Sequence, residues 1–136
     1  MNGRTIEPLA KRPLIALLED DDGVRRSMQL LLQGRGFNVK AFSGAEALLE
    51  DPDMGNAAYL IADYWLGELD GISVLGTLRK RGWTGQAMLI TAFGTAELGR
   101  RATTAGFCEV FEKPVRDHAL VAALDRLTGL RQRDLE

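Results

Sequence analysis

Five short apolar runs, each followed by a stretch of helical periodicity, limit this chain to a small set of folds. The first run, Leu14–Leu18, is continuous in aliphatic residues, as expected of a strand buried on both faces of a parallel sheet. Strands that alternate with helices are typical of βα units, in which each helix crosses one face of the sheet. The pattern therefore predicts a doubly wound α/β domain.

The other elements follow from the same pattern. Gly34-Arg35-Gly36 ends the first helix, since glycine accepts a left-handed backbone at a helix stop. Ser43, with Glu46 three residues later, predicts a capping box at the start of the second helix. Further strands are expected at 37–42, 58–62, 87–91 and 108–112, with helices beginning near 43, 71, 95 and 117. Five strands and five helices in strict alternation predict a flavodoxin-like (βα)5 parallel sheet with strand order 2-1-3-4-5.

The bulk properties are those of one domain. We expect a mobile N-terminal tail at 1–13, the folded domain at 14–130 and a short C-terminal tail at 131–136. The sequence contains neither a secretory signal nor an apolar run approaching the roughly 20 residues of a membrane span. Its single cysteine, Cys108, favours a reducing cytoplasm, and we expect this side chain to be buried. The net charge of −2 gives no general attraction to nucleic acid.

Acidic residues follow the first and third predicted strands. Glu19 and Asp20 come directly after Leu14–Leu18, and Asp63 ends the run that begins near residue 58. In the predicted sheet these two strands are neighbours, so the three carboxylates converge in the crevice where such sheets bind ligands. Carboxylates so placed repel one another unless a cation lies among them, and oxygen ligands suit Mg²⁺. The alternative is that acids after strands are solvated or cap the next helix.

Two further polar features lie at strand ends. Lys113-Pro114 follows the fifth predicted strand, where a lysine can pair with a carboxylate or with an oxyanion attached to it. Thr91 ends the fourth strand, and its hydroxyl can donate a hydrogen bond to a phosphoryl oxygen. Taken singly, each is explained as well by an exposed lysine or an ordinary strand threonine. Together with the acids they predict a site that handles phosphate.

Four motifs in register now resemble a known family. They are LIALLEDDDGVR, YLIADYWLGELDG, LITA and VFEKP, and they span about Leu14 to Leu127. In this order and spacing they resemble the receiver domain of bacterial two-component response regulators, of the stand-alone, single-domain type. The resemblance implies a phosphoprotein in which an aspartate accepts a phosphoryl group from a histidine kinase or a histidine phosphotransfer protein.

The resemblance also assigns roles to individual residues. It implies that Asp63 is the phosphoacceptor, that Thr91 follows the phosphoryl group and that Lys113 pairs with it. The implied Mg²⁺ ligands are Glu19, Asp20, Asp63 and the backbone carbonyl of Trp65, with Asp20 the more direct ligand of the acidic pair. Such a chain is a signalling switch that assists its own phosphorylation and dephosphorylation, and is not an enzyme in the ordinary sense.

The implied output is a change of the face made by the fourth helix, the fifth strand and the fifth helix. That face would bind a downstream protein target, with no direct contact to DNA or membrane, because a helix-turn-helix module has no room after Glu136. Three alternatives stay open. The chain is a receiver segment of a hybrid histidine kinase, a degenerate module that is never phosphorylated, or a hydrolase that forms an aspartyl intermediate, although Trp65 stands where that class has a second acid.

Several positions depart from the family pattern. Gly67 replaces the usual proline four residues after Asp63, which predicts a more mobile loop. Val110 replaces an aromatic residue that moves with the threonine, and alternation along the strand directs the neighbouring Phe111 to the opposite face. Trp65 and Phe93 border the site of the phosphoryl group. Either they shield it from water and prolong its lifetime, or they only pack on the surface.

Overall fold

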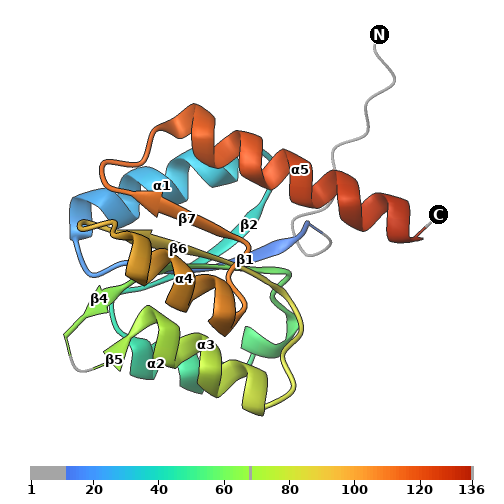
Figure 1. The fold of residues 1–136 in the computed structure, drawn as a ribbon. Helices are drawn as coiled ribbons and strands as arrows, with labels where there is room; N and C mark the ends of the chain where they lie inside the picture. Colours follow the sequence, from blue (N-terminus) through green and yellow to red (C-terminus); the bar gives the residue numbers. More distant parts are fainter. Residues whose placement is uncertain (1–11, 68, 136) are drawn as a thin grey trace, which may run out of the picture.

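A five-stranded parallel sheet forms the centre of the molecule (Figure 1). We describe a computed structural model of the chain, over residues 12–67 and 69–135. The strands lie in the order β2-β1-β3-β6-β7, so that the chain order within this sheet is 2-1-3-4-5, as predicted. Their bounds are β1 Leu14–Leu18, β2 Asn38–Phe42, β3 Tyr59–Asp63, β6 Gln86–Thr91 and β7 Glu109–Glu112.

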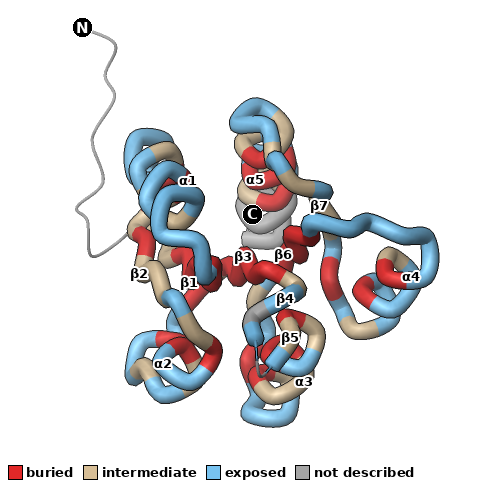
Figure 2. The backbone as a smooth tube through the Cα atoms, turned by 90° about the vertical axis from the view of Figure 1, so that its left-hand side faces the viewer, coloured by how far each residue is buried: buried red, intermediate tan, exposed pale blue. Residues whose placement is uncertain are grey.

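Helices cover both faces of this sheet (Figures 1 and 2). Helices α1 (Asp22–Gly34) and α5 (Asp117–Leu135) lie on one face. The opposite face is covered by α2 (Ala45–Glu50), α3 (Gly71–Lys80) and α4 (Ala96–Ala105). This arrangement confirms the flavodoxin-like α/β fold.

The core consists of two apolar layers, one on each face of the sheet, because successive strand residues point to opposite sides. Figure 2 shows the buried residues concentrated in the central strands and on the helix sides that face them. In β3, Leu60 and Ala62 pack toward α2, α3 and α4, whereas Tyr59 and Ile61 pack toward α1 and α5. Burial on both faces explains why the strands read as continuous apolar runs and not as alternating ones.

Several local details differ from the prediction. A small antiparallel ribbon, β4 (Trp65–Leu66) paired with β5 (Leu69–Asp70), follows β3, and a 3-10 helix η2 (Met54–Asn56) lies within the expected loop. The prediction of a capping box at Ser43 was wrong, because Gly44 is the N-cap of α2 and the helix start has no side-chain cap. Runs of two or three residues contain no periodicity from which to predict them.

The two ends of the chain can be compared with the domain limits that the sequence predicted. Most of the predicted N-terminal tail, residues 1–11, lies outside the described residues. Helix α5 continues to Leu135 and so includes most of the segment 131–136 that was predicted to be a tail. Within the described part of the chain, none of the helices combines the length and apolar character that a membrane crossing requires.

Candidate functional site

The predicted site residues all follow or end strands at one edge of the sheet. Glu19 follows β1, Asp63 ends β3, Thr91 ends β6 and Lys113 follows β7. The strand registers bring these ends together, since Leu18 pairs with Ala62, Asp63 with Ile90, and Thr91 with Glu112. Parallel pairing therefore gathers residues that are up to 94 positions apart in the sequence, from Glu19 to Lys113 (113 − 19 = 94).

The three acidic residues form one cluster. A carboxylate oxygen from each of Glu19, Asp20 and Asp63 lies within 4.8 Å of the others. Glu19 and Asp63 are buried, with 1% and 4% of their surface exposed, whereas Asp20 is exposed. The predicted convergence of the acids is thus present, at a position that solvent reaches from the side of Asp20.

Lys113 lies between the two buried carboxylates. Its Nζ is 2.6 Å from Oδ2 of Asp63 and 2.8 Å from Oε1 of Glu19. Burial by itself would lower the pKa of Lys113, but hydrogen bonding to Asp63 and Glu19, together with their charges, raises it. Lys113 is therefore held as a cation, positioned to contact any anion attached to Asp63. The Lys113–Pro114 peptide bond is cis.

Glu19 is the carboxylate least satisfied by its surroundings. Burial raises its pKa, against the opposing effects of Lys113 and of the Asp21 N–H, which donates to Oε2 at 3.0 Å; the charge of Asp63 raises it further. Oε1 is buried and, apart from its ion pair with Lys113, receives no hydrogen bond from the described residues. The cluster therefore carries more negative charge than its lysine balances.

This charge excess is suited to a divalent cation. Three carboxylates against one ammonium leave a formal charge of about −2 when all are ionised, and Glu19 Oε1 has unused acceptor capacity. Hard cations such as Mg²⁺ take carboxylate, carbonyl and water oxygens. Glu19, Asp20 and Asp63 thus form an acidic cluster able to hold such an ion. The carbonyl of Trp65 as a further ligand stays a prediction.

Both oxygens of Asp63 are engaged. Oδ2 accepts from Lys113, and Oδ1 accepts from the backbone N–H of Trp65 at 3.2 Å. Thr91 is buried at the end of β6, the strand next to β3. Its Oγ1 accepts a hydrogen bond from the Phe93 N–H at 3.1 Å. The Thr91 carbonyl accepts from the Lys113 N–H at 2.8 Å, so these two residues are joined through the backbone.

Asp21 and Asp22 belong to helix α1 and not to the acidic cluster. The Asp21 side chain caps α1 by accepting from the Val24 N–H, and Asp22 lies in the first turn, where it pairs with Arg25. Carboxylates at these positions favour the helix dipole. The four consecutive acids therefore divide into two residues of the cluster and two residues of the helix start.

The departures from the family pattern have structural counterparts. Val110 packs with the layer under α4 and Phe111 with the layer under α5, which confirms that they point to opposite faces. Gly67 has a φ of +82°, a conformation closed to proline. Burial of Cys108 was predicted wrongly: it is exposed just before the edge strand β7, and its Sγ donates to the Ala87 carbonyl at 3.2 Å.

Two features near the site had no clear signal in the sequence. Gly71 packs so closely on β3 that a Cβ placed there would lie 2.6 Å from the Asp63 carbonyl oxygen. Tyr64, directly after Asp63, contacts Arg101 of α4 through its ring and its hydroxyl. The second contact joins residues 37 positions apart and depends on tertiary packing.

Comparison with known proteins agrees with this geometry. The model of the response regulator receiver domain family matches residues 15–125. The response regulator protein TodT of Pseudomonas putida is 29% identical over 111 residues, covering 82% of this chain and 49% of TodT. The transcriptional regulatory protein FixJ of Rhizobium meliloti is 29% identical over 113 residues, covering 82% of this chain and 55% of FixJ. The chain therefore spans about half the length of these relatives.

A solved structure shows the same fold. The CheY-like response regulator receiver domain protein from Methanospirillum hungatei superimposes with a TM-score of 0.80, over 91% of this chain and 99% of that chain, at 16% identity. The family match covers most of the chain, and the acids, threonine and lysine lie together at the strand ends. This chain belongs to the response regulator receiver domain family.

Proposed function

We propose that Asp63 accepts a phosphoryl group from a phosphohistidine on a histidine kinase or a phosphotransfer protein. The observation that carries the proposal is the cluster of Glu19, Asp20 and Asp63 together with Lys113, whose Nζ lies 2.6 Å from the carboxylate of Asp63. A buried carboxylate with an adjacent ammonium is a nucleophile whose product, an acyl phosphate, has a counter-charge in place.

The chain's own part in the reaction uses groups at the strand ends. A carboxylate oxygen of Asp63 attacks phosphorus, the P–N bond of the phosphohistidine breaks, and the imidazole leaves with the electron pair. Lys113 then pairs with a phosphoryl oxygen, and the Thr91 hydroxyl donates to another. Asp20, Asp63, the Trp65 carbonyl and the acidic partner Glu19 would hold Mg²⁺. When bound, Mg²⁺ neutralises charge on the transferring group.

Two grooves support docking of the partners. One, of about 660 Å³, lies between α1 and the β7–α5 connection, is lined by Val24, Met28 and Pro114 among others, and reaches Lys113. An apolar groove beside the reactive group suits a helical phosphodonor. The other, also of about 660 Å³, lies between α4 and β7 where Gly99 and Val110 are small. It belongs to the α4–β7–α5 face, which we propose changes on phosphorylation to bind a downstream protein.

The proposal describes a switch within a cytoplasmic phosphorelay. The cytoplasm is proposed because a lone cysteine suits a reducing compartment. A stand-alone regulator and a receiver segment of a longer protein, such as a hybrid histidine kinase, use the same chemistry at Asp63. TodT and FixJ are each about twice as long as the region that they share with this chain.

Incubation with acetyl phosphate and Mg²⁺ is expected to add one phosphoryl group. Intact mass spectrometry should show a single adduct of about 80 Da on the wild type and none on Asp63→Asn, because an amide oxygen is too weak a nucleophile. Asp53→Asn is the matched control, since this exposed aspartate also pairs with a lysine, Lys40, and should leave the adduct intact. Chelation of Mg²⁺ should suppress the adduct in the wild type and in Asp53→Asn.

The opposite result has a defined meaning. A wild type that takes no adduct from acetyl phosphate or from a phosphorylated kinase would identify a binding module that is never phosphorylated. An adduct that persists in Asp63→Asn would move the phosphoacceptor to another residue. Release of phosphate from ester substrates at a steady rate would instead favour the hydrolase alternative.

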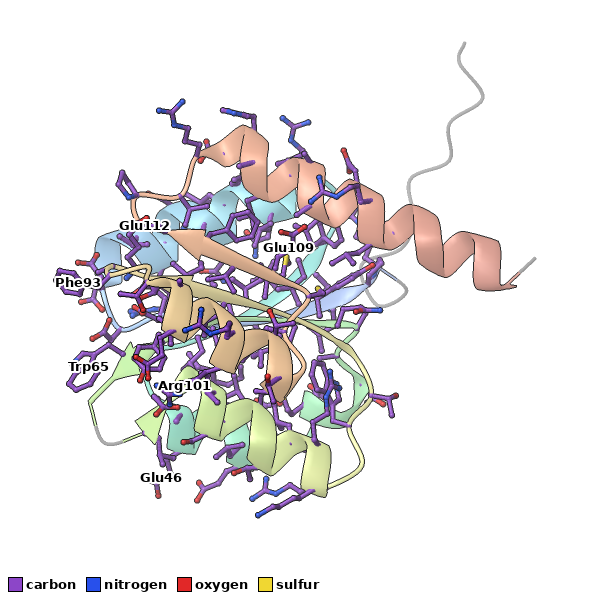
Figure 3. All side chains as sticks on the ribbon, in the orientation of Figure 1. Glu46, Trp65, Phe93, Arg101, Glu109 and Glu112 are labelled. Atoms are coloured by element: carbon purple, nitrogen blue, oxygen red, sulfur yellow. The ribbon has the colours of Figure 1, made fainter. Side chains whose placement is uncertain are left out.

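The phosphorylated form is expected to be long-lived because of two exposed aromatic residues. Trp65 and Phe93 are 69% and 83% exposed and lie on the outside of the molecule near the strand ends, and the Trp65 ring centroid is 6.5 Å from that of Tyr64 (Figure 3). Both follow site residues by two positions, and their apolar rings would exclude water from an acyl phosphate on Asp63.

Trp65→Asn and Phe93→Ser should each accelerate loss of the adduct severalfold, measured by intact mass against time. Leu30→Asn, an exposed apolar residue of α1, is the control. Equal rates in all variants would contradict the shielding.

A further inference from the structure

Helix α4 has a direct side-chain connection to the residue next to Asp63. The guanidinium carbon of Arg101 lies 5.9 Å from the ring centroid of Tyr64, within the range of a cation–π interaction. Its Nη1 also donates to the Tyr64 hydroxyl at 3.3 Å. In Figure 3, Arg101 extends from α4 toward the β4–β5 ribbon that follows Asp63. The contact thus joins α4 to the segment that contains the proposed phosphoacceptor.

Both ends of this connection are fixed to their elements. The Tyr64 N–H donates to the Ile90 carbonyl at 2.7 Å, and the Tyr64 carbonyl accepts from the Gly71 N–H at 2.8 Å. The Tyr64 ring is half-buried against the apolar layer under α4. These backbone hydrogen bonds fix Tyr64 relative to the segment that contains Asp63. A displacement of the backbone at Asp63 would therefore move the Tyr64 ring as well.

Arg101 is held over the ring by more than one attraction. Hydrogen bonding to Tyr64 and the negative charges of Asp70 and Glu97 all favour the guanidinium at this place. Glu97 lies four residues earlier on α4, a spacing at which helix side chains meet. Asp70 belongs to β5, so the arginine is attracted both by its own helix and by the ribbon.

Among the described residues, no side-chain hydrogen bond or ion pair of this kind joins the edge strand β7 to α4. Val110 of β7 packs in the layer beneath α4, but its short side chain has no group that can follow a displacement at the strand ends. A groove remains between it and α4. Any influence of Asp63 on α4 needs a contact that differs between two states of the protein.

We propose that Tyr64 and Arg101 form that contact, restraining α4 while Asp63 is unmodified and releasing it when Asp63 becomes an acyl phosphate. The inference rests on the proposed function, and it assigns Tyr64 and Arg101 as positioning residues for the output face, not as catalytic ones. The contact between Tyr64 and Arg101 lies on the side of α4 that faces β3. The effect of Asp63 on α4 would therefore be transmitted from the segment that contains the phosphoacceptor and not from β7.

Hydrogen–deuterium exchange of α4, with and without beryllium fluoride and Mg²⁺ as a stand-in for the phosphoryl group, tests this coupling. In the wild type, beryllium fluoride should speed exchange in α4. Arg101→Met and Tyr64→Leu should speed it without beryllium fluoride by about two- to fivefold, the size expected for an exposed cation–π contact, and should reduce the further change by as much. Arg100→Met, on the adjacent exposed residue, should behave as wild type.

The outcomes separate this inference from the proposed function. Intact mass after acetyl phosphate, measured on the same proteins, reports phosphorylation independently of α4. An adduct on all variants, with α4 responding equally in Arg101→Met and Arg100→Met, would overturn the coupling alone. No adduct on the wild type would overturn the proposed function and the coupling with it. Arg101 is exposed, so its variant should fold even if Tyr64→Leu does not, and a combined variant should add nothing to either single change.

Discussion

Replacing Lys113 with Met is expected to destabilise the protein at neutral pH by roughly 2–3 kcal/mol in Mg²⁺-free buffer. The substitution leaves the buried carboxylates of Glu19 and Asp63 next to each other without the ammonium that now lies 2.8 and 2.6 Å away. Loss of one partner from a buried ion pair costs more than the pair itself contributes. The expected loss is below that for a fully buried pair because the Lys113 side chain is 24% exposed.

The pH dependence of this loss follows from Glu19. Burial raises the pKa of Glu19 in the wild type, and Lys113 opposes that rise, so removing the lysine raises the pKa further. A carboxyl whose pKa is higher in the folded state is least costly when protonated. Stability contributed in this way is present at low pH and is lost as the pH rises through the folded-state pKa. The destabilisation of Lys113→Met should therefore be smaller at pH 5 than at pH 8.

Urea unfolding at the two pH values measures this effect, with two informative companions. Glu19→Gln combined with Lys113→Met should recover much of the lost stability, because the amide removes one of the two unpaired charges. Lys40→Met is the matched control: Lys40 also contacts two carboxylates, at 3.2 and 2.6 Å, but its side chain is 41% exposed, so its removal should matter far less. Equal losses for the two lysine variants would show that burial does not set the energetics of the site.

The sequence was sufficient to predict that these polar side chains converge, for a reason specific to parallel sheets. Strands that run in one direction end at one edge, so Glu19, Asp63, Thr91 and Lys113 converge once the strand order is known. The βα alternation limits the sheet to a few strand orders, of which the flavodoxin-like order was the one predicted, and the strands were located to within one residue at either end. The local βα pattern of the sequence and the contacts of the folded protein are therefore consistent with each other.

What the sequence did not contain is information about close packing between distant segments. Arg101 resembles any exposed helix arginine until α4 is placed beside Tyr64. The ribbon β4–β5 has only two residues in each strand, which is too short for any alternation to be visible. Ser43 satisfied a capping pattern, but the helix begins at Ala45, and only the backbone of Gly44 determines that start.

Gly71→Ala is expected to destabilise the protein by about 1–3 kcal/mol, the usual range for overpacking a well-filled core. A Cβ at this position would lie 2.6 Å from the carbonyl oxygen of Asp63 and 2.9 Å from Cδ1 of Leu89. The Leu89 side chain can move, but the Asp63 carbonyl belongs to a strand paired with β1 and β6. The added methyl group must therefore displace the backbone of β3 or the start of α3.

Gly76→Ala separates this steric effect from the change in helix propensity. Gly76 lies in the same helix, and a Cβ there meets no atom within 4 Å, so alanine should stabilise the protein by about 0.5–1 kcal/mol. The two substitutions are chemically identical and should have opposite signs in urea unfolding. If Gly71→Ala were as stable as Gly76→Ala, the close approach of α3 to Asp63 would not be a constraint on the fold.

The same pair of variants connects packing to function. A shift of Asp63 by a few tenths of an ångström changes its position relative to Lys113 and to the acids, which must be aligned for transfer. Adduct formation from acetyl phosphate should slow by about tenfold in Gly71→Ala, since misplacements of about 1 Å cost about a hundredfold. Gly76→Ala should react at the wild-type rate. The absence of a side chain at position 71 would then contribute to the reaction rate by keeping the carboxylate of Asp63 in position.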